Sequence, residues 1–409
     1  MDDDPRLPPA GDRTAAPDAV AGGTSNTMAG EAVSSVQTRD VHGGIHIHVE
    51  SGRPRRRRSR RLPRRWLALA VGLALAAGLI AASQLRRGED PGRGPMVVDG
   101  RGGFVWAHDP TASRYRPVAQ KSMYVYNSAD AADVEIVREG VGEYAVRFGG
   151  LGVAGGVAHA SAYGPTSDFC VVAGLAEEGM TEVVRVRCFD TGGAPVDVRF
   201  VASFAHRSVG DGRFSYLWAE PRNERYRPGD PATRYDSTGG VAWVERRSAG
   251  QYLVHVPASA GVPTAKQFYQ VTARGDGPAH CKLAAPPAPS GVQQVTCRDV
   301  RGEPVDHAFL LSFSAGSSVI GRTDRHFGNA SSAVDADVMR VETGYYRVRS
   351  REMGSPSGHA TASALGESDA YCHVENWVPD GADLVSDVRC FSASAHSPTD
   401  AAFFIGTSW

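Results

Sequence analysis

The sequence predicts an all-β fold of three tandem disulfide-containing β-sandwich-like repeats, preceded by one transmembrane helix and a disordered N-terminal tail. Three observations predict it. An apolar run at 66–85 follows a dense arginine cluster, all six cysteines lie after that run, and a set of short motifs recurs three times within 102–409. The formal net charge of −1 over 409 residues hides an asymmetry, because basic charge concentrates just before the apolar run.

Residues 1–52 are expected to form a disordered cytoplasmic tail. Residues 1–35 are rich in Pro, Gly, Asp, Ala and Ser and contain no aromatic residue, so they cannot bury enough apolar surface to offset chain entropy. A β-prone segment at 36–50, VQTRDVHGGIHIHVE, carries a Gly-Gly turn and then alternates apolar and polar residues. Stacked in register with copies from other chains, such a segment forms a cross-β ladder.

This segment resembles the actinobacterial amyloid signalling motifs that are related to the RIP homotypic interaction motif. The resemblance rests on its Val-Gln, Gly-Gly and alternating His/Ile elements. The expected self-assembly residues are Val36, Gln37, Val41, His42, Gly43, Gly44, Ile45, His46, Ile47, His48 and Val49. The resemblance implies a homotypic partner with a similar segment in a bacterial conflict system. An inert tether is the alternative, and no Cys, Asp or Glu completes a metal site with these histidines at a familiar spacing.

Residues 53–65 form a polybasic juxtamembrane segment with nine arginines, and 66–85 follow as the predicted transmembrane helix. At about 1.5 Å per residue, twenty helical residues span roughly 30 Å, the thickness of the hydrocarbon core. The more basic flank stays in the cytoplasm, which predicts a single-pass protein of the cell membrane with an extracellular C-terminal region. A cleaved signal peptide and a buried core helix are the alternatives. Residues 86–101 are interpreted as a flexible stalk.

Three β-repeats are expected at 102–207, 208–316 and 317–409. Each contains a Gly-x-Tyr motif, a cysteine pair and a Pro-x-Asp-x-x-Phe motif, and the first two open with Trp-Ala. Short segments that often alternate apolar and polar residues, separated by Gly, Pro, Asp or Ser, predict strands throughout. We expect three separate sandwiches rather than one closed architecture such as a trefoil or propeller, because each repeat is long enough to hold its own core.

The cysteines predict one disulfide in each repeat. An even number confined to one side of the predicted membrane indicates an oxidising compartment. Pairing within a repeat closes a loop of about sixteen to eighteen residues, worth roughly 3 kcal/mol. The expected pairs are Cys170 with Cys188, Cys281 with Cys297, and Cys372 with Cys390. The region resembles uncharacterised secreted actinobacterial β-repeat proteins, a resemblance that implies no activity.

The sequence contains no nucleophile elbow, zincin motif, P-loop or dinucleotide fingerprint. We therefore expect a non-enzymatic protein without cofactor or nucleic-acid partner, whose tail couples a defence-signalling partner to the membrane while the repeats bind an extracellular ligand or envelope component. The alternative is a cell-surface adhesion protein with a passive tail, and an extracellular hydrolase is the least favoured. The repeated polar and aromatic residues are interpreted as structural: Asp197, Asp306 and Asp400 as turn caps, and Tyr144, Tyr252, Tyr346, Trp106 and Trp218 as core residues.

Overall fold

Turns rich in glycine, aspartate and proline divide the chain into short strands. The computed structural model describes residues 100–117, 125–129, 133–207, 213–315, 319–323, 336–354 and 358–408. These residues form twenty-five strands and no α-helix, with three single-turn 3-10 helices at Pro231–Thr233, Pro257–Ser259 and Thr264–Lys266. The predicted all-β class is therefore confirmed for this part of the chain.

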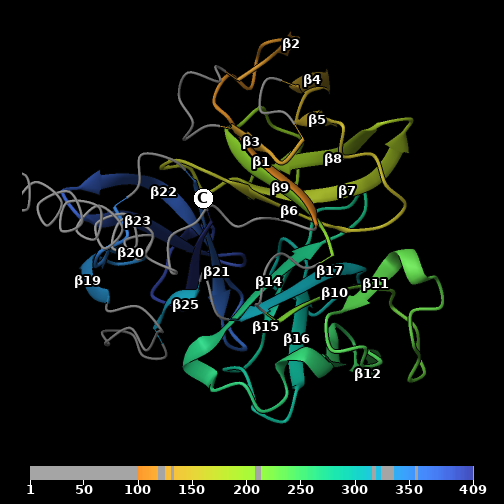
Figure 1. The fold of residues 1–409 in the computed structure, drawn as a ribbon. Coiled ribbons are helices and arrows are strands. Elements are labelled where there is room, and N and C mark those ends of the chain that lie inside the picture. The colour runs from red at the N-terminus through yellow and green to blue at the C-terminus, as the bar shows by residue number, and fades with distance from the viewer. Residues whose placement is uncertain are drawn as a thin grey trace, which may run out of the picture. The chain divides into compact units, whose positions relative to one another are not determined.

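The first repeat forms two antiparallel sheets (Figure 1). Here the inner sheet of a repeat is the one without the cysteines, and the outer sheet is the one that carries them. The inner sheet consists, in spatial order, of β3 (Val125–Asn127), β1 (Arg101–Ala107), β9 (Phe200–His206) and β6 (Val157–Ala162). The outer sheet consists of β2 (Arg114–Tyr115), β4 (Val134–Gly140), β5 (Glu143–Gly149), β8 (Thr181–Phe189) and β7 (Phe169–Glu178).

The second repeat follows the same plan. Its inner sheet consists of β11 (Arg234–Asp236), β10 (Arg213–Ala219), β17 (Phe309–Ala315) and β14 (Gln267–Ala273). Its outer sheet consists of β12 (Trp243–Ser248), β13 (Gln251–His255), β16 (Val292–Arg298) and β15 (His280–Leu283).

The third repeat has a smaller inner sheet, and its strands also join those of the second repeat. Its inner strands are β21 (His359–Leu365), β25 (Ala402–Ser408) and β18 (Val319–Thr323). Its outer strands are β19 (Ala336–Glu342), β20 (Tyr345–Ser350), β23 (Asp383–Ser392) and β22 (Ala370–Asp380), with β24 (Ser397–Pro398) beside β23. A single parallel pair, Leu283 with Leu365, links β15 to β21, so the two repeats share one seven-stranded sheet.

Three equivalent backbone hydrogen bonds close the repeats into a ring. In each, a glycine that follows an inner strand donates its N–H to a carbonyl of a neighbouring repeat. The three glycines have φ angles of +121°, +133° and +108°. The bonds run from Gly164 to Val374 at 3.2 Å, from Gly275 to Val172 at 3.0 Å, and from Gly366 to Leu283 at 3.0 Å. The repeats therefore meet cyclically, first with second, second with third, and third with first.

The buried apolar clusters also cross the repeat boundaries. The cluster centred on the first repeat includes Tyr216 and Leu310 of the second, and the cluster centred on the third includes Phe104 and Trp106 of the first. The expectation of three separate sandwiches is therefore wrong. Each repeat is long enough to form two sheets, but those sheets leave apolar faces that only a neighbouring repeat covers.

The predicted transmembrane helix is not part of the observed fold. Among the residues that the structure describes, no helix has the length and apolar character needed to cross a membrane. For the described residues, the predicted fold class is corrected accordingly to an all-β unit with three disulfides and no membrane-spanning helix. The segment from which the helix was predicted, 66–85, lies outside the described residues, as do the predicted tail, the polybasic segment and all but the last two residues of the stalk.

Candidate ligand-binding cavity

All three predicted disulfides are present, each between neighbouring antiparallel strands. Cys281 and Cys297 lie directly opposite each other on β15 and β16, with their Cα atoms 4.1 Å apart. The bonds are Cys170–Cys188, Cys281–Cys297 and Cys372–Cys390. They indicate that the protein folds in an oxidising, extracellular environment.

The recurring sequence motifs build one hydrogen-bond network in each repeat. In the third repeat, the Asp400 carboxylate accepts hydrogen bonds from the Gly344 N–H and the Tyr346 hydroxyl, both at 3.0 Å, and pairs with the Arg340 guanidinium at 2.9 Å. The same groups meet in the other repeats as Arg138, Gly142, Tyr144 and Asp197, and as Arg246, Gly250, Tyr252 and Asp306. These conspicuous residues are therefore part of the scaffold.

The aspartates were expected to cap nearby backbone, and this detail is wrong. The N–H that Asp400 accepts from belongs to a residue 56 positions earlier in the chain. The arginine beside it, which the sequence analysis did not single out, is the main cause that lowers the pKa of Asp400 to about 2. The network ties the last strand of a repeat to a turn near its start.

The two tryptophans lie at junctions between repeats. The Trp106 ring packs against Tyr163 and against Trp377 of the third repeat, with centroids 4.5 and 5.4 Å apart. Trp218 donates its indole N–H to the Gly156 carbonyl of the first repeat at 2.7 Å. Both are packing residues, as expected, but they join neighbouring repeats.

A cavity of about 90 Å³ lies where the three repeats meet. Its walls are the inner strands β6, β14 and β21 and the strands that follow them, β7, β15 and β22 (Figure 1). Side chains alternate between the two faces of a strand. On β6, the alanines at 158, 160 and 162 belong to the core of the first repeat. His159 and Ser161 lie on the opposite face and line the cavity.

The strand registers make the lining positions equivalent in the three repeats. Ala162, Ala273 and Ala364 each pair with the phenylalanine of a Pro-x-Asp-x-x-Phe motif. The residues three positions and one position before these alanines form two polar layers in the cavity wall, each with one residue from every repeat. One layer consists of His159, Gln270 and Thr361, and the other of Ser161, Thr272 and Ser363.

Hydrogen bonds across the cavity wall join side chains of different repeats. His159 of the first repeat lies between two hydroxyls of the second, with Nδ1 at 2.9 Å from Thr272 Oγ1 and Nε2 at 2.7 Å from Ser312 Oγ. Gln270 of the second repeat donates its side-chain N–H to Thr361 Oγ1 of the third at 2.6 Å. The polar layers therefore help to hold the ring together.

Three rings pack together at the cavity, with His280 stacked on Tyr371 and tilted against Phe169. Phe169, His280 and Tyr371 each directly precede the first cysteine of a pair, and all three line the cavity. The His280 ring centroid lies 3.9 Å from that of Phe169 and 4.2 Å from that of Tyr371. This position was not predicted from the sequence, although an aromatic or imidazole ring directly before the first cysteine of each pair is a recurring feature of the repeats.

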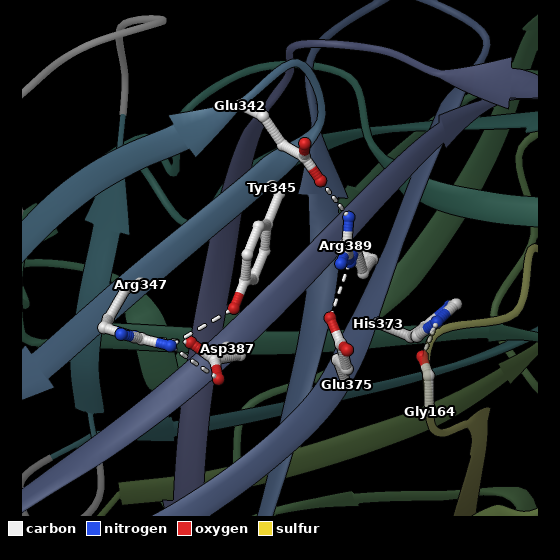
Figure 2. Close-up of polar contacts among 8 residues, drawn as sticks. All are labelled: Gly164, Glu342, Tyr345, Arg347, His373, Glu375, Asp387 and Arg389. Atoms are coloured by element: carbon white, nitrogen blue, oxygen red, sulfur yellow. Dashed lines mark hydrogen bonds and ion pairs between the residues drawn. The ribbon is translucent and has the colours of Figure 1, made fainter. Parts of the chain in front are cut away.

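Three buried histidines and one half-buried histidine, His280, contact residues of another repeat. We call His159, His280, His359 and His373 the junction histidines. Figure 2 shows one of them, His373, whose Nε2 lies 3.0 Å from the Gly164 carbonyl oxygen. Desolvation lowers the pKa of all four, to about 3 for His159 and His280 and to about 4 for His359 and His373. They are neutral in the folded ring at neutral pH.

His159 and His359 each stand shortly after a glycine in the sequence, but they do not occupy equivalent positions in the repeats. The strand registers place Thr361 of the third repeat where the first repeat has His159, and His359 where the first repeat has Val157. The two histidines therefore do not form one repeated site. The chain offers the cavity a single histidine in the layer that also contains Gln270 and Thr361.

The outer sheet of the third repeat carries a charged face whose groups are matched. Figure 2 shows Arg389 between two glutamates and beside the Tyr345 ring. The ion pairs are Arg347 with Asp387 at 2.8 Å, Arg389 with Glu342 at 2.7 Å, and Arg389 with Glu375 at 2.5 Å. Solvent-accessible pairs of this kind contribute little to stability, and each of these charged groups already has a partner of opposite sign. The cavity is therefore the better candidate for a site.

The predicted self-assembly residues, Val36 to Val49, lie outside the described part of the chain. Comparison with known proteins found no matching family model, no similar curated protein and no similar solved structure. Both resemblances read from the sequence therefore stay predictions. The candidate site is the polar cavity between the three repeats.

Proposed function

We propose that the disulfide-bonded ring is a non-enzymatic extracellular binding module whose ligand occupies the cavity. The observation that carries this proposal is the chemistry of the cavity wall. Protein interiors are close-packed, and a buried polar group is costly unless it finds a hydrogen-bond partner. A cavity of about 90 Å³ with polar side chains from all three repeats is what a binding site requires.

The size of the cavity limits the ligand. A single water needs at least about 10–15 Å³, so a volume of about 90 Å³ has room for several waters or for one small molecule. Serine and threonine hydroxyls and the Gln270 amide offer both donors and acceptors. These properties favour a small polar molecule, or the polar end of a larger one.

Binding is favoured over catalysis by the environment of His159. Its ring lies within hydrogen-bonding distance of two hydroxyls, an arrangement that also occurs where histidine activates a nucleophile. Both nitrogens face hydroxyls, however, so no carboxylate holds the second nitrogen as a triad would. Burial also lowers the pKa of His159 to about 3, far below the pH at which a general base works best.

The proposal is tested with a cavity-filling variant of the full chain. Ser363→Phe places a ring in the cavity, and Ser290→Phe places the same ring at an exposed loop position as the matched control. Small polar molecules, including monosaccharides, amino acids and short-chain acids, are screened for an increase in melting temperature. We expect at least one to stabilise the native protein and the control but not Ser363→Phe. A ligand that stabilises all three alike would place the binding site elsewhere and refute the proposal.

We propose as a second function that the segment at 36–50 assembles with itself or with a partner that has a matching segment. Its Gly-Gly turn and the alternation of apolar and polar residues from Ile45 to Val49 support this function. A peptide of residues 31–51 should form fibres with a cross-β reflection near 4.7 Å. Proline at Gly43 or Ile45 should prevent assembly, whereas proline at Ser34, outside the motif, should not. A peptide that stays monomeric at high concentration would favour the alternative of an adhesion protein with a passive tail.

A further inference from the structure

The cavity wall contains a buried lysine. Lys282 on β15 is 5% exposed and lies two residues after His280, so both side chains leave the same face of the strand. It is one of only three lysines in the chain, beside Lys121 and Lys266. Lysine is almost never fully buried unless it is paired.

The Lys282 ammonium has only neutral hydrogen-bond partners. Its Nζ donates to the Ala370 carbonyl at 2.7 Å and, at a longer 3.4 Å, to the Ser368 hydroxyl. An ammonium has three N–H donors, so one remains without an acceptor among the described residues. No carboxylate of the described chain lies within ion-pair distance of it either.

The charged groups near Lys282 do not form an ion pair with it among the described residues. Asp369 is the carboxylate that acts on it, but its oxygen accepts hydrogen bonds from the Ser392 hydroxyl at 2.8 Å and from the N–H and hydroxyl of Ser394. Arg298 on the adjacent strand adds a second positive charge. The other titratable groups that line the cavity are His159, His280, Tyr371 and His373. None of these four carries a negative charge at neutral pH.

Lys282 therefore places a positive charge in the interior without a direct ion-pair partner. Desolvation, followed by the charge of Arg298, lowers the pKa of Lys282 to about 7. A buried charge without an opposite partner is strongly destabilising, and an anion placed beside it relieves that cost. The cavity adjoining Lys282 is the space in which an anion fits.

We propose that the cavity binds a small carboxylate and that the Lys282 ammonium receives its negative charge. This inference rests on the proposed binding function and names the chemical class of the ligand. The carboxylate pairs with Lys282, and the hydroxyls of Thr272 and Ser363 bond the remaining polar atoms of the ligand. The volume of about 90 Å³ restricts it to a molecule of the size of acetate or lactate.

The experiment compares lactate with lactamide, its neutral analogue of nearly the same shape, using the melting temperature of the full chain. Near pH 6 lactate should stabilise the native protein and lactamide should not. Near pH 9 the Lys282 amine is mostly neutral, so lactate should bind about 100-fold more weakly. Lys266→Met, which removes an exposed lysine, is the matched control and should behave as the native protein does.

Two variants at the site make the test decisive. Lys282→Met should lose the lactate effect at both pH values. Lys282→Arg keeps a positive charge at all pH values, so lactate should stabilise it near pH 9 as well as near pH 6. Equal stabilisation by lactate and lactamide, a lactate effect that survives in Lys282→Met, or no effect of acetate, lactate or pyruvate near pH 6 would overturn the inference. If a neutral ligand binds and Ser363→Phe blocks it, the carboxylate inference fails while the proposed binding function stands.

Discussion

The sharpest prediction for the fold concerns the glycine of the Gly-x-Tyr motif, tested by Gly250→Ala. Gly250 has a φ of +65°, and a Cβ there would lie 2.4 Å from the Cys297 carbonyl oxygen and 2.8 Å from the Val305 nitrogen. Both are backbone atoms, one in β16 and the other next to Asp306, so neither moves aside as a flexible side chain would. The second repeat also supplies a control, Gly261, which has a φ of +73° and no atom within 4 Å of its Cβ position.

The two variants share one cost and differ in another. Alanine in the left-handed region costs about 1–2 kcal/mol at either site. At Gly250 the backbone must also move, which breaks the bond from Cys297 N–H to the Gly250 carbonyl at 2.8 Å and the bond from Gly250 N–H to Asp306 at 3.0 Å. Those bonds are worth roughly 1 kcal/mol for the neutral pair and 1.5–3 kcal/mol for the carboxylate. The expected loss is about 3–6 kcal/mol for Gly250→Ala.

Thermal unfolding followed by circular dichroism measures the difference. At roughly 2 °C per kcal/mol, Gly261→Ala should lower the melting temperature by about 2–4 °C and Gly250→Ala by about 6–12 °C. Urea titration should give the same order. Two variants that melt within 1 °C of each other would show that backbone conformation alone matters at Gly250, and would refute the steric reasoning.

Three further perturbations test the ring. Acidification should destabilise the ring between about pH 6.5 and pH 4.5, because folding lowers the pKa of the junction histidines. The stability present above about pH 6.5 is lost as the histidines of the unfolded state take up protons. A melting temperature that stays constant over that range would contradict this. Replacing both Cys281 and Cys297 by alanine should cost roughly 3 kcal/mol in a urea titration, and a loss below 1 kcal/mol would contradict the loop-closure estimate. Trp218→Phe removes the hydrogen bond to the Gly156 carbonyl and should lower the free energy of unfolding by about 1–2 kcal/mol. The ring of Trp243 stacks on His255, and Trp243→Phe should cost less. Equal losses would show that the junction hydrogen bond contributes nothing.

The strands and disulfides were readable from the sequence because their signals are local. Alternating apolar residues mark the strands, and each cysteine pair closes a short loop of 16 or 18 residues. The arginine of the aspartate network was not predicted from the sequence, because Arg340 and Asp400 lie 60 residues apart and no spacing rule connects them. A comparison of the three repeats position by position would have found it, since each has an arginine four residues before the glycine of Gly-x-Tyr.

The closed ring and its cavity depend on contacts that no single repeat encodes. The residues of the cavity wall read as ordinary strand residues, because Ser161, Thr272 and Ser363 alternate with alanine or valine as they would on a solvent-facing strand. Only the meeting of three inner strands turns that face inward. Lys282 likewise gives no signal in sequence, since its burial comes from the third repeat.

The cyclic closure constrains the order in which the newly made chain matures. Phe104 and Trp106 are among the first described residues to be synthesised, yet they are covered by the cluster of the third repeat. His373 closes onto Gly164 across a separation of 209 residues. Until the last repeat has been made, the first displays aromatic surface with nothing to cover it, a state prone to aggregation. Export of the finished chain before folding, or a chaperone that shields the first repeat, would protect the nascent protein.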